Sequence, residues 1–530
     1  MVANQAPVAN QIQDRQTPSQ EAGPSQEIVV QQFSQQMHGL LDQLIFKTLH
    51  DVEQHVPLHK IELSAWKTFL TIGRTLLQMI FQILGTGDLG PRLTLPDGRN
   101  LKRLEDLSRR DYTCPFGEFH LEWTAYGTRK GKKIELVPLA DRLGMPGSKF
   151  SYLLQDWDQS EVMEQPFDKA RGAMQRILDL QQHVDSLETM NRQMARSVED
   201  FHAAQQPPDP ESEGEILVQT ADHKGVPLQH PADRTTAADH DAEAPRRENR
   251  KRMAALAGVY SIDSYVRTPE QVVEALFSQP GTPRDPDLPP RPKPQNKRLR
   301  ACLPHENHLG EEIDGTAAMF GWLADEVFGR NPEGLKMLIH LTDGEECLRT
   351  TRDVFQEDVA MVDILDLLHA TSRVWRASRL LGYTGEAERE KFVRERIHWI
   401  LQGNVTSVIA SFRSLSTRRG VTGKRQKELQ KICNYFEKNA YRMRYDEYLA
   451  KGYPIASGVI EGACRNVVKD RMERTGMSWV IEGAQAMLSL RCVWLCDSWE
   501  EYQAFRIERE TQRLHPNRSW LKELPWALAT

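Results

Sequence analysis

The chain has 530 residues, of which 39% are hydrophobic and 27% charged, enough for two or three domains with buried cores. Its formal net charge of -6 excludes a global positive field, so any nucleic-acid partner must be bound by local basic patches. No apolar run approaches the ~20 residues of a membrane span, and the Gln-rich N-terminus lacks a secretion signal. Seven cysteines without a Cys-x-x-Cys pair argue against a disulfide scaffold and a structural zinc site, and favour a cytoplasmic protein with no membrane partner.

The N-terminal residues fall into a polar tail and a more apolar region. Residues 1–34 are dominated by Gln, Pro, Ser and Ala, and this composition predicts a disordered tail. Beyond them, apolar side chains recur at helical spacing and predict two helices that separate near Val56 and Pro57. The strings FHLEWTAYG and KKIELVPL alternate polar and apolar residues, which predicts a strand pair joined by a turn at 128–131.

Residues 35–203 are interpreted as a mostly helical N-terminal region that binds DNA. Within it, residues 151–179 and 185–201 predict two helices, with Asp185 as an N-cap and Glu188 three residues later. Helix, short turn and helix outline a helix-turn-helix at about 151–201, although an ordinary helical hairpin has the same pattern. The Pro-rich residues 204–214 predict a linker.

After the linker, the expected order is three strands, a helix, a strand, a helix and a strand. The strands are expected at 216–222, 253–262, 297–303, 335–342 and 359–365, with the helices at 311–328 and 347–355. This order matches the ribonuclease-H-like α/β sheet. We therefore predict a ribonuclease-H-like catalytic domain at residues 215–500, with a large all-helical insertion at about 370–452. A C-terminal tail at 501–530 follows it.

Three acidic residues lie where such a fold would bring them together. Asp222 ends the first strand, Asp343 ends the fourth, and Glu461 lies in the first turn of a helix that begins near residue 457. Three converging carboxylates repel one another, and Mg²⁺ relieves this repulsion while binding substrate phosphates. Two such ions would support an in-line phosphoryl transfer. Taken singly, each acid also fits a turn or helix-start role.

Two further residues follow the fifth strand as an Asp-x-x-His pair. Asp366 and His369 are predicted to be accessory to the acidic site, where the carboxylate would orient the imidazole or reach the metal. Asp366 is also the second choice for the second metal-binding acid. The alternative interpretation is a helix N-cap followed by a half-buried histidine.

Basic and aromatic residues near Glu461 are candidates for DNA contacts. Arg465 and Lys469 follow Glu461 at i+4 and i+8 and share its helical stripe, while Arg471 and Trp479 come shortly after. We predict that all four contact DNA, the tryptophan by stacking on a base. A solvated ion pair and a core tryptophan are the alternatives.

Three basic runs are also suited to neutralising DNA phosphates. They lie at 246–252, 291–300 and 413–427. Most charge runs are simply solvated faces, so each run alone says little about function.

Taken together, these strings resemble the DDE transposases of bacterial insertion sequences of the ISKra-four group. The resemblance rests on TADHKGVPL around Asp222, LTDGEECL around Asp343 and ILDLLHATSRVWRAS, and it extends from about residue 110 to about residue 513. The longest and most specific string surrounds Glu461, namely GYPIASGVIEGACRNVVKDRMERTGMSWVIEGAQAMLSLRCVWL.

The resemblance implies a catalytic and metal-binding triad, formed by Asp222, Asp343 and Glu461, with Asp366 and His369 as accessory residues. It implies Mg²⁺ or Mn²⁺, cleavage at terminal inverted repeats, and strand transfer during movement of an insertion sequence. The implied partners are transposon-end DNA, target DNA and further copies of the chain in a homodimer or higher multimer. The implied location is the bacterial cytoplasm, in association with the nucleoid.

One residue departs from the family pattern. His223 stands where the family has glycine, which places a side chain beside Asp222. The departure leaves open an alternative function, a catalytically inactive, sequence-specific DNA-binding protein derived from a transposase. A nuclease without strand transfer is a third, weaker interpretation.

Overall fold

The computed structural model describes residues 26–128, 134–229, 251–278, 289–306, 310–474 and 477–524. These residues form mixed helix and sheet, as predicted for an α/β protein. The chain divides into two compact units: unit 1 comprises Met1–Asp158, Arg171–Gln182 and Ile507–Thr530, and unit 2 comprises Gln159–Ala170 and His183–Arg506. The division does not follow the predicted linker, which lies inside unit 2.

Unit 1 begins with two long helices in contact, α1 (Gln26–Glu53) and α2 (Leu58–Leu84), and the predicted break between them is confirmed. The predicted disordered tail is wrong for residues 26–34, which belong to α1, whereas residues 1–25 lie outside the described residues. The polar composition of this stretch concealed a helical start that includes the buried Val29.

Two small sheets of unit 1 replace the predicted strand pair. Their strands are β1 (Arg92–Thr94), β2 (Asn100–Arg103), β3 (Ser108–Cys114), β4 (Gly117–Trp123) and β5 (Tyr126–Gly127), followed by helix α3 (Pro138–Leu143). The string FHLEW lies in β4 but pairs with the upstream β3, because a two-residue loop closes that hairpin at little entropic cost. Of the downstream string, Leu136 makes a single bridge to Tyr126, and most of the predicted turn lies outside the described residues.

The predicted helix-turn-helix region contains four helices. They are α4 (Tyr152–Glu164), α5 (Phe167–Leu178), α6 (Val184–Ala195) and α7 (Val198–Ala204). The residue before α6 is His183, whose side chain makes no capping bond, so Asp185 is not the N-cap. The boundary between the units falls within α5, whose first residues up to Ala170 belong to unit 2 with α6 and whose remaining residues belong to unit 1. The DNA-binding interpretation stays a prediction.

A buried carboxyl in α4 gives unit 1 a pH-dependent stability. Asp158 is fully buried, accepts a 2.7 Å hydrogen bond from Gln182 Nε2, and has its pKa raised by burial to about 7. The native state keeps this proton to higher pH than the unfolded chain, whose aspartate pKa is about 3.9. Stability is therefore lost as pH rises from about 4 to about 7, and stays reduced above that range.

We expect Asp158→Asn to stabilise the protein by about 1–3 kcal/mol at pH 8 and by less at pH 5. Thermal melts of the variant and the unaltered chain at both pH values measure the difference. Asp179→Asn, at an exposed position with φ of 58°, is the matched control and should change little. An equal effect of Asp158→Asn at both pH values would contradict the assignment.

Unit 2 centres on a five-stranded sheet with the order β12–β11–β6–β7–β8. Its strands are β6 (Ile216–Pro227), β7 (Lys251–Ile262), β8 (Gln295–Cys302), β11 (Met337–Thr342) and β12 (Val362–Leu365). Strand β11 runs parallel to β6 and β12, whereas β6, β7 and β8 are antiparallel neighbours. All five predicted strands are present, but β6 pairs with β7 as far as Pro227, so Asp222 does not end its strand as predicted.

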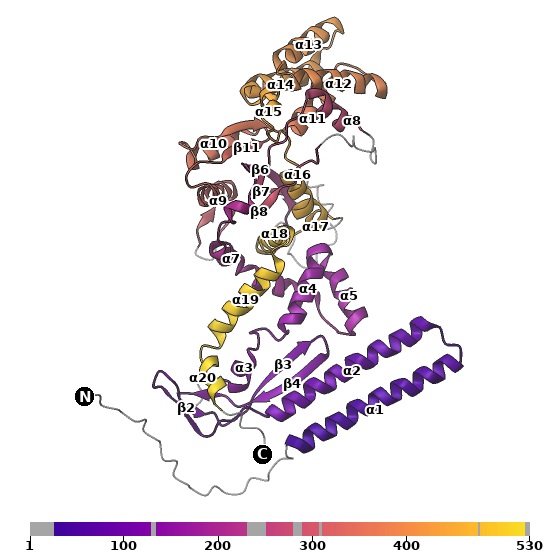
Figure 1. The fold of residues 1–530 in the computed structure, drawn as a ribbon, viewed down its shortest axis with the longest axis vertical. Helices are drawn as coiled ribbons and strands as arrows, with labels where there is room; N and C mark the ends of the chain where they lie inside the picture. The colour runs from indigo at the N-terminus through magenta and orange to yellow at the C-terminus, as the bar shows by residue number, and fades with distance from the viewer. Residues whose placement is uncertain are drawn as a thin grey trace, which may run out of the picture. The chain divides into compact units, whose positions relative to one another are not determined.

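Helices cover both faces of this sheet (Figure 1). On one face α9 (Gly315–Arg330) and α10 (Glu346–Phe355) pack against Leu217 and Ala221; on the other, α11 (Leu367–Leu380) packs against Ile216 and Val218. Because successive strand residues point to opposite faces, Asp222 lies on the α11 face and His223 lies on the α9 face.

The rest of unit 2 is mostly helical. The remaining elements up to the end of the predicted helical insertion are α8 (Pro269–Phe277), β9 (His305–Glu306), β10 (Glu312–Ile313), α12 (Glu386–Leu401), α13 (Val405–Arg418), α14 (Gly423–Asn439) and α15 (Tyr445–Ala450). Those that follow are α16 (Gly458–Ala463), α17 (Asp470–Met472) and α18 (Ile481–Leu495). Helix α19 (Trp499–Leu514) passes from unit 2 into unit 1 at Ile507, and α20 (Arg518–Glu523) belongs to unit 1. Within the described part of the chain, none of the helices combines the length and apolarity that a membrane span requires.

The helix predicted after residue 457 is present from Gly458 to Met472, but its hydrogen-bond pattern changes along its length. Between α16 and α17, the residues Cys464–Lys469 form a π-helical segment. A π turn holds about one more residue than an α turn, so the spacing from Arg465 to Lys469 differs from that of a regular α-helix. Glu461, Arg465 and Lys469 are all exposed, and their shared stripe stays a prediction.

Candidate active site

Two of the predicted acids lie side by side at the end of β11. The parallel register pairs Gln219 with His340, and Asp222 and Asp343 each lie three residues farther along their strands. Thr220 Oγ1 donates a 2.7 Å hydrogen bond to the carbonyl of Leu341, which continues the alignment beyond the paired residues. The sheet therefore brings these two carboxylates to the same edge.

The environment of Asp343 concentrates negative charge. Burial raises the pKa of Asp343, and the neighbouring charges of Glu345 and Asp222 raise it further. The backbone N–H of Glu345, which donates to Asp343 Oδ1 at 2.8 Å, and the nearby His369 act in the opposite direction. An added cation at this edge would relieve the repulsion between the carboxylates.

Glu461 reaches the same place through the first turn of α16. The side chain of the N-cap residue Ser457 accepts a 3.3 Å hydrogen bond from the backbone N–H of Ile460, which starts this helix. His369 Nε2 then lies 3.1 Å from Glu461 Oε1, while its Nδ1 lies 3.9 Å from Asp343 Oδ2. The structure thus brings Asp343, His369 and Glu461 together around one imidazole.

Asp366 has a different position from the one predicted for a metal ligand. It is 1% exposed and caps α11, with Oδ1 accepting from the N–H of Leu368 at 2.7 Å. Its Oδ2 accepts from the N–H of Ser457 at 2.9 Å, and burial raises its pKa. Both oxygens are occupied by backbone donors, so Asp366 holds the start of α16 in place. The second choice of Asp366 as a metal ligand is corrected, and the N-cap alternative is confirmed.

Two residues that the sequence did not single out fix α16 over the sheet. The buried Cys464 donates a 3.3 Å hydrogen bond to Asp222 Oδ2, and burial together with the charge of Asp222 raises its thiol pKa. Ser457 Oγ lies 3.1 Å from Thr220 Oγ1. The signal in the sequence was the position of Cys464, a residue with a polar S–H group, on the apolar flank of the helix. This signal is weak, because cysteine is also an ordinary core residue.

The three acids offer the right chemistry for a divalent cation but are not closed around one. Among the described residues, the group of three ligand atoms found within 4.8 Å of one another comes from His223, Glu345 and Cys347, not from the three acids. Carboxylate oxygens in a region of excess negative charge nevertheless fit Mg²⁺ or Mn²⁺, which take hard oxygen ligands. Rotation of the partly exposed Glu461 side chain away from His369 would be needed to complete such a site.

Two of the predicted DNA contacts are available to a ligand. Arg465 and Lys469 are exposed, and Arg465 Nε forms a 3.2 Å ion pair with Asp470. Lys224 was missed by the sequence reasoning. It lies two residues after Asp222, on the same face of β6, and its charge acts on the Cys464 thiol. The two-residue period of a strand was the signal that could have identified it.

The other two predicted DNA contacts are buried. Arg471 is 1% exposed, donates to the carbonyl of Val162 at 2.7 Å, and has its pKa lowered by burial to about 9. Trp479 donates through Nε1 to the carbonyl of Met472 at 3.1 Å and packs against Phe167. Both side chains belong to the core beneath α17, and this placement corrects the prediction that they contact DNA.

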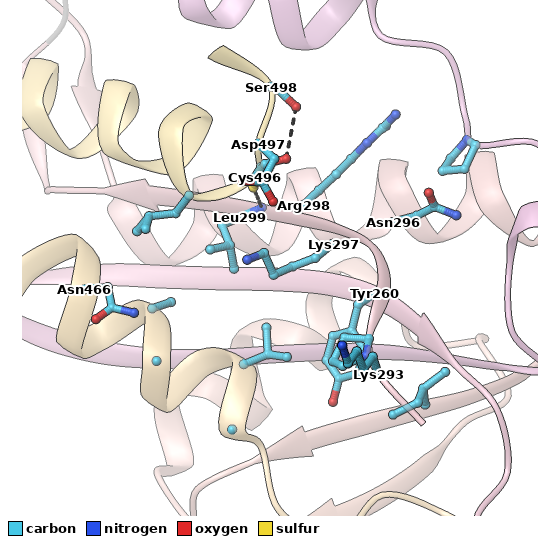
Figure 2. Close-up of a pocket in the computed structure, with 18 of the residues that line it drawn as sticks. Tyr260, Lys293, Asn296, Lys297, Arg298, Leu299, Asn466, Cys496, Asp497 and Ser498 are labelled. Atoms are coloured by element: carbon cyan, nitrogen blue, oxygen red, sulfur yellow. Dashed lines mark hydrogen bonds between the residues drawn. The ribbon is translucent and has the colours of Figure 1, made fainter. Parts of the chain in front are cut away.

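A basic groove lies on the side of α16 away from Glu461. Figure 2 shows part of its lining, which includes Lys293, Lys297 and Asn466, and its volume is about 1090 Å³. Gly458 and Gly462 line it too, so the α16 backbone is open at these positions. Arg298 forms an ion pair with Glu326. The other three cations of the groove are Arg291, Lys293 and Lys297, and no carboxylate of the described residues lies within ion-pair distance of them. Two acids, Asp497 and Glu501, complete the lining.

Comparison with known proteins adds no assignment. No protein-family model matches the chain, and no curated protein matches it. The family resemblance of the sequence motifs stays a prediction, and the function has to be argued from the site.

Proposed function

We propose that this chain is a DNA transposase that cleaves terminal inverted repeats in a metal-dependent reaction and transfers the freed strands to target DNA as a multimer. The observation that carries the proposal is the meeting of Asp222, Asp343 and Glu461 at one sheet edge. The strand order β12–β11–β6–β7–β8, with β7 antiparallel to its neighbours, supports the ribonuclease-H-like arrangement on which the proposal rests.

The residues of the site divide into ligands and positioning groups. The three acids would hold the divalent cation, which when bound stabilises developing charge and activates a water or a 3′-hydroxyl. Cys464 orients the carboxylate of Asp222, while Asp366 sets the position of α16 through Ser457. Lys224, together with Arg465, is suited to binding the phosphate that is attacked.

The alternative of an inactive DNA-binding protein rests on His223. Its imidazole lies 2.7 Å from Glu345 and 3.0 Å from Thr316 of α9, on the sheet face opposite Asp222. The side chain therefore leaves the carboxylate face open. This geometry favours an active enzyme over the inactive derivative.

The proposal is tested by mixing the purified chain with Mg²⁺ and a plasmid that carries the DNA flanking its reading frame. We expect breaks at the ends of inverted repeats and, with a second plasmid present, joined donor–target products. Specific binding without breaks in Mg²⁺ or Mn²⁺ would favour the inactive alternative. Breaks without any joined product would favour a nuclease.

The basic groove is the proposed path of a DNA backbone. Each lysine that contacts a phosphate contributes about one unit to the slope of log affinity against log salt. Lys293→Glu and Lys297→Glu, made separately, should each lower the affinity for a labelled duplex of arbitrary sequence and reduce that slope by about one. Fluorescence anisotropy over a range of salt concentrations measures both quantities. Lys391→Glu, at an exposed position of α12, is the control, and an equal effect there would remove the groove from the proposal.

A further inference from the structure

A cluster of three different ligand types lies on the α9 face of the sheet. His223 extends from β6, Glu345 from the loop after β11, and Cys347 from the first turn of α10. Their ligand atoms all lie within 4.8 Å of one another, with His223 Nδ1 2.7 Å from Glu345 Oε2 and Cys347 Sγ 3.6 Å from the same oxygen. Residues far apart in the sequence thus present nitrogen, oxygen and sulfur donors to one point.

We propose that His223, Glu345 and Cys347 bind a divalent transition-metal ion of the Zn²⁺ class, at a site separate from the three catalytic acids. Imidazole and thiolate donors select such ions over Mg²⁺. Three protein ligands leave a fourth tetrahedral position for water or another group, and both Glu345 and Cys347 are exposed to solvent. The absence of a Cys-x-x-Cys pair argues only against a closed, all-cysteine type of site.

The surroundings of His223 provide a second observation. Its Nε2 lies 3.0 Å from Thr316 Oγ1, at the start of α9. When Nε2–H donates to this hydroxyl, the lone pair of Nδ1 faces Glu345 and Cys347. Histidine ligands are usually held in this way by a hydrogen bond from the second ring nitrogen. The ring is also largely enclosed, with 12% of the side chain exposed, so its orientation is fixed before any ion binds.

The proposed site and the catalytic acids differ in position and in chemistry. Asp222 points to the α11 face of β6, whereas His223 points to the α9 face. An ion on His223 would tie β6 to the loop that follows Asp343, and would need none of the three acids. The site is therefore independent of the proposed function.

Cobalt titration of the full, reduced chain tests the proposal. A thiolate ligand gives bound Co²⁺ a charge-transfer band in the near ultraviolet, which carboxylate ligands do not give. We expect this band at one equivalent of Co²⁺, its displacement by Zn²⁺, and its loss in Cys347→Ser. His223→Ala should weaken Co²⁺ binding, and Thr316→Val should weaken it by about tenfold or more. No band in the unaltered chain at saturating Co²⁺ would overturn the proposal.

Three control variants separate this site from its neighbours. Cys464→Ser removes the thiol next to Asp222 and should leave the band intact. If the band is lost in Cys464→Ser but kept in Cys347→Ser, the ion binds at the catalytic acids and the proposal is overturned. Glu346→Gln, next to Glu345, should have no effect. Glu461→Gln should keep the band whether or not the chain cleaves DNA. The metal-site proposal and the transposase proposal can therefore fail independently of each other. Thermal melts of each variant confirm that it folds.

Discussion

Glu461→Gln is expected to abolish cleavage of inverted-repeat ends, slowing it by about a thousandfold or more. Glutamine keeps the size of the side chain but lacks the charge that would hold a divalent cation, and several kcal/mol of transition-state stabilisation would be lost. Each 1.36 kcal/mol corresponds to a factor of about ten in rate. The Glu461 side chain is 43% exposed, so the melting temperature should hardly change. Single-turnover cleavage of an end-containing duplex and a thermal melt measure the two effects.

The matched control is Glu482→Gln, an exposed first-turn glutamate of α18. It should cleave at the normal rate, because it too is a first-turn glutamate but lies outside the site. His369→Ala should slow cleavage less than Glu461→Gln, because it leaves all three carboxylates of the site in place. Normal cleavage by Glu461→Gln, with none by Asp222→Asn, would show that the third acid lies elsewhere.

The central sheet was predictable because its strands carry strong local patterns. Short apolar runs that end at turn residues identify β11 and β12, and their positions were predicted within a few residues. The length of β6 was not predictable in this way. It continues past Asp222 because β7 pairs with it as far as Lys251, and this pairing depends on residues distant in the sequence. In the same way, β4 pairs with β3 rather than with the downstream string, which local alternation cannot decide.

The candidate site was predictable where position in the sheet decides the geometry. Asp343 directly follows β11, and Glu461 lies in the first turn of α16, which are the positions predicted for them in the chain. Side-chain burial decided the remaining cases. Arg471 and Trp479 have the residue types of DNA contacts, but α4 supplies a carbonyl acceptor to the arginine, and Phe167 packs against both side chains. No feature of the string around Arg471 indicates this distant partner.

Arg442→Met is expected to be the most destabilising change discussed, by about 3–5 kcal/mol of unfolding free energy. The side chain is 2% exposed, and its guanidinium lies 2.8 Å from Asp363 Oδ1. It also donates to Thr342 Oγ1 at 2.7 Å and to the carbonyls of Asp343 at 3.1 Å and Ile364 at 3.2 Å. Methionine fills similar space but removes these donors from the interior, and Asp363 is left with Arg352 as its cationic partner. Urea unfolding, followed by tryptophan fluorescence, measures the loss.

The same contacts make Arg442 a positioning residue for the catalytic edge. Because it joins the ends of β11 and β12 and holds the carbonyl of Asp343, its loss should displace that carboxylate. Arg442→Lys keeps the charge but not the planar fork of donors, so it should slow cleavage even at temperatures where the variant is folded. Arg444→Met, at an exposed ion pair with Glu447, is the control and should change stability by less than about 1 kcal/mol. Unchanged stability in Arg442→Met would mean that the desolvation of a buried guanidinium offsets all of its contacts.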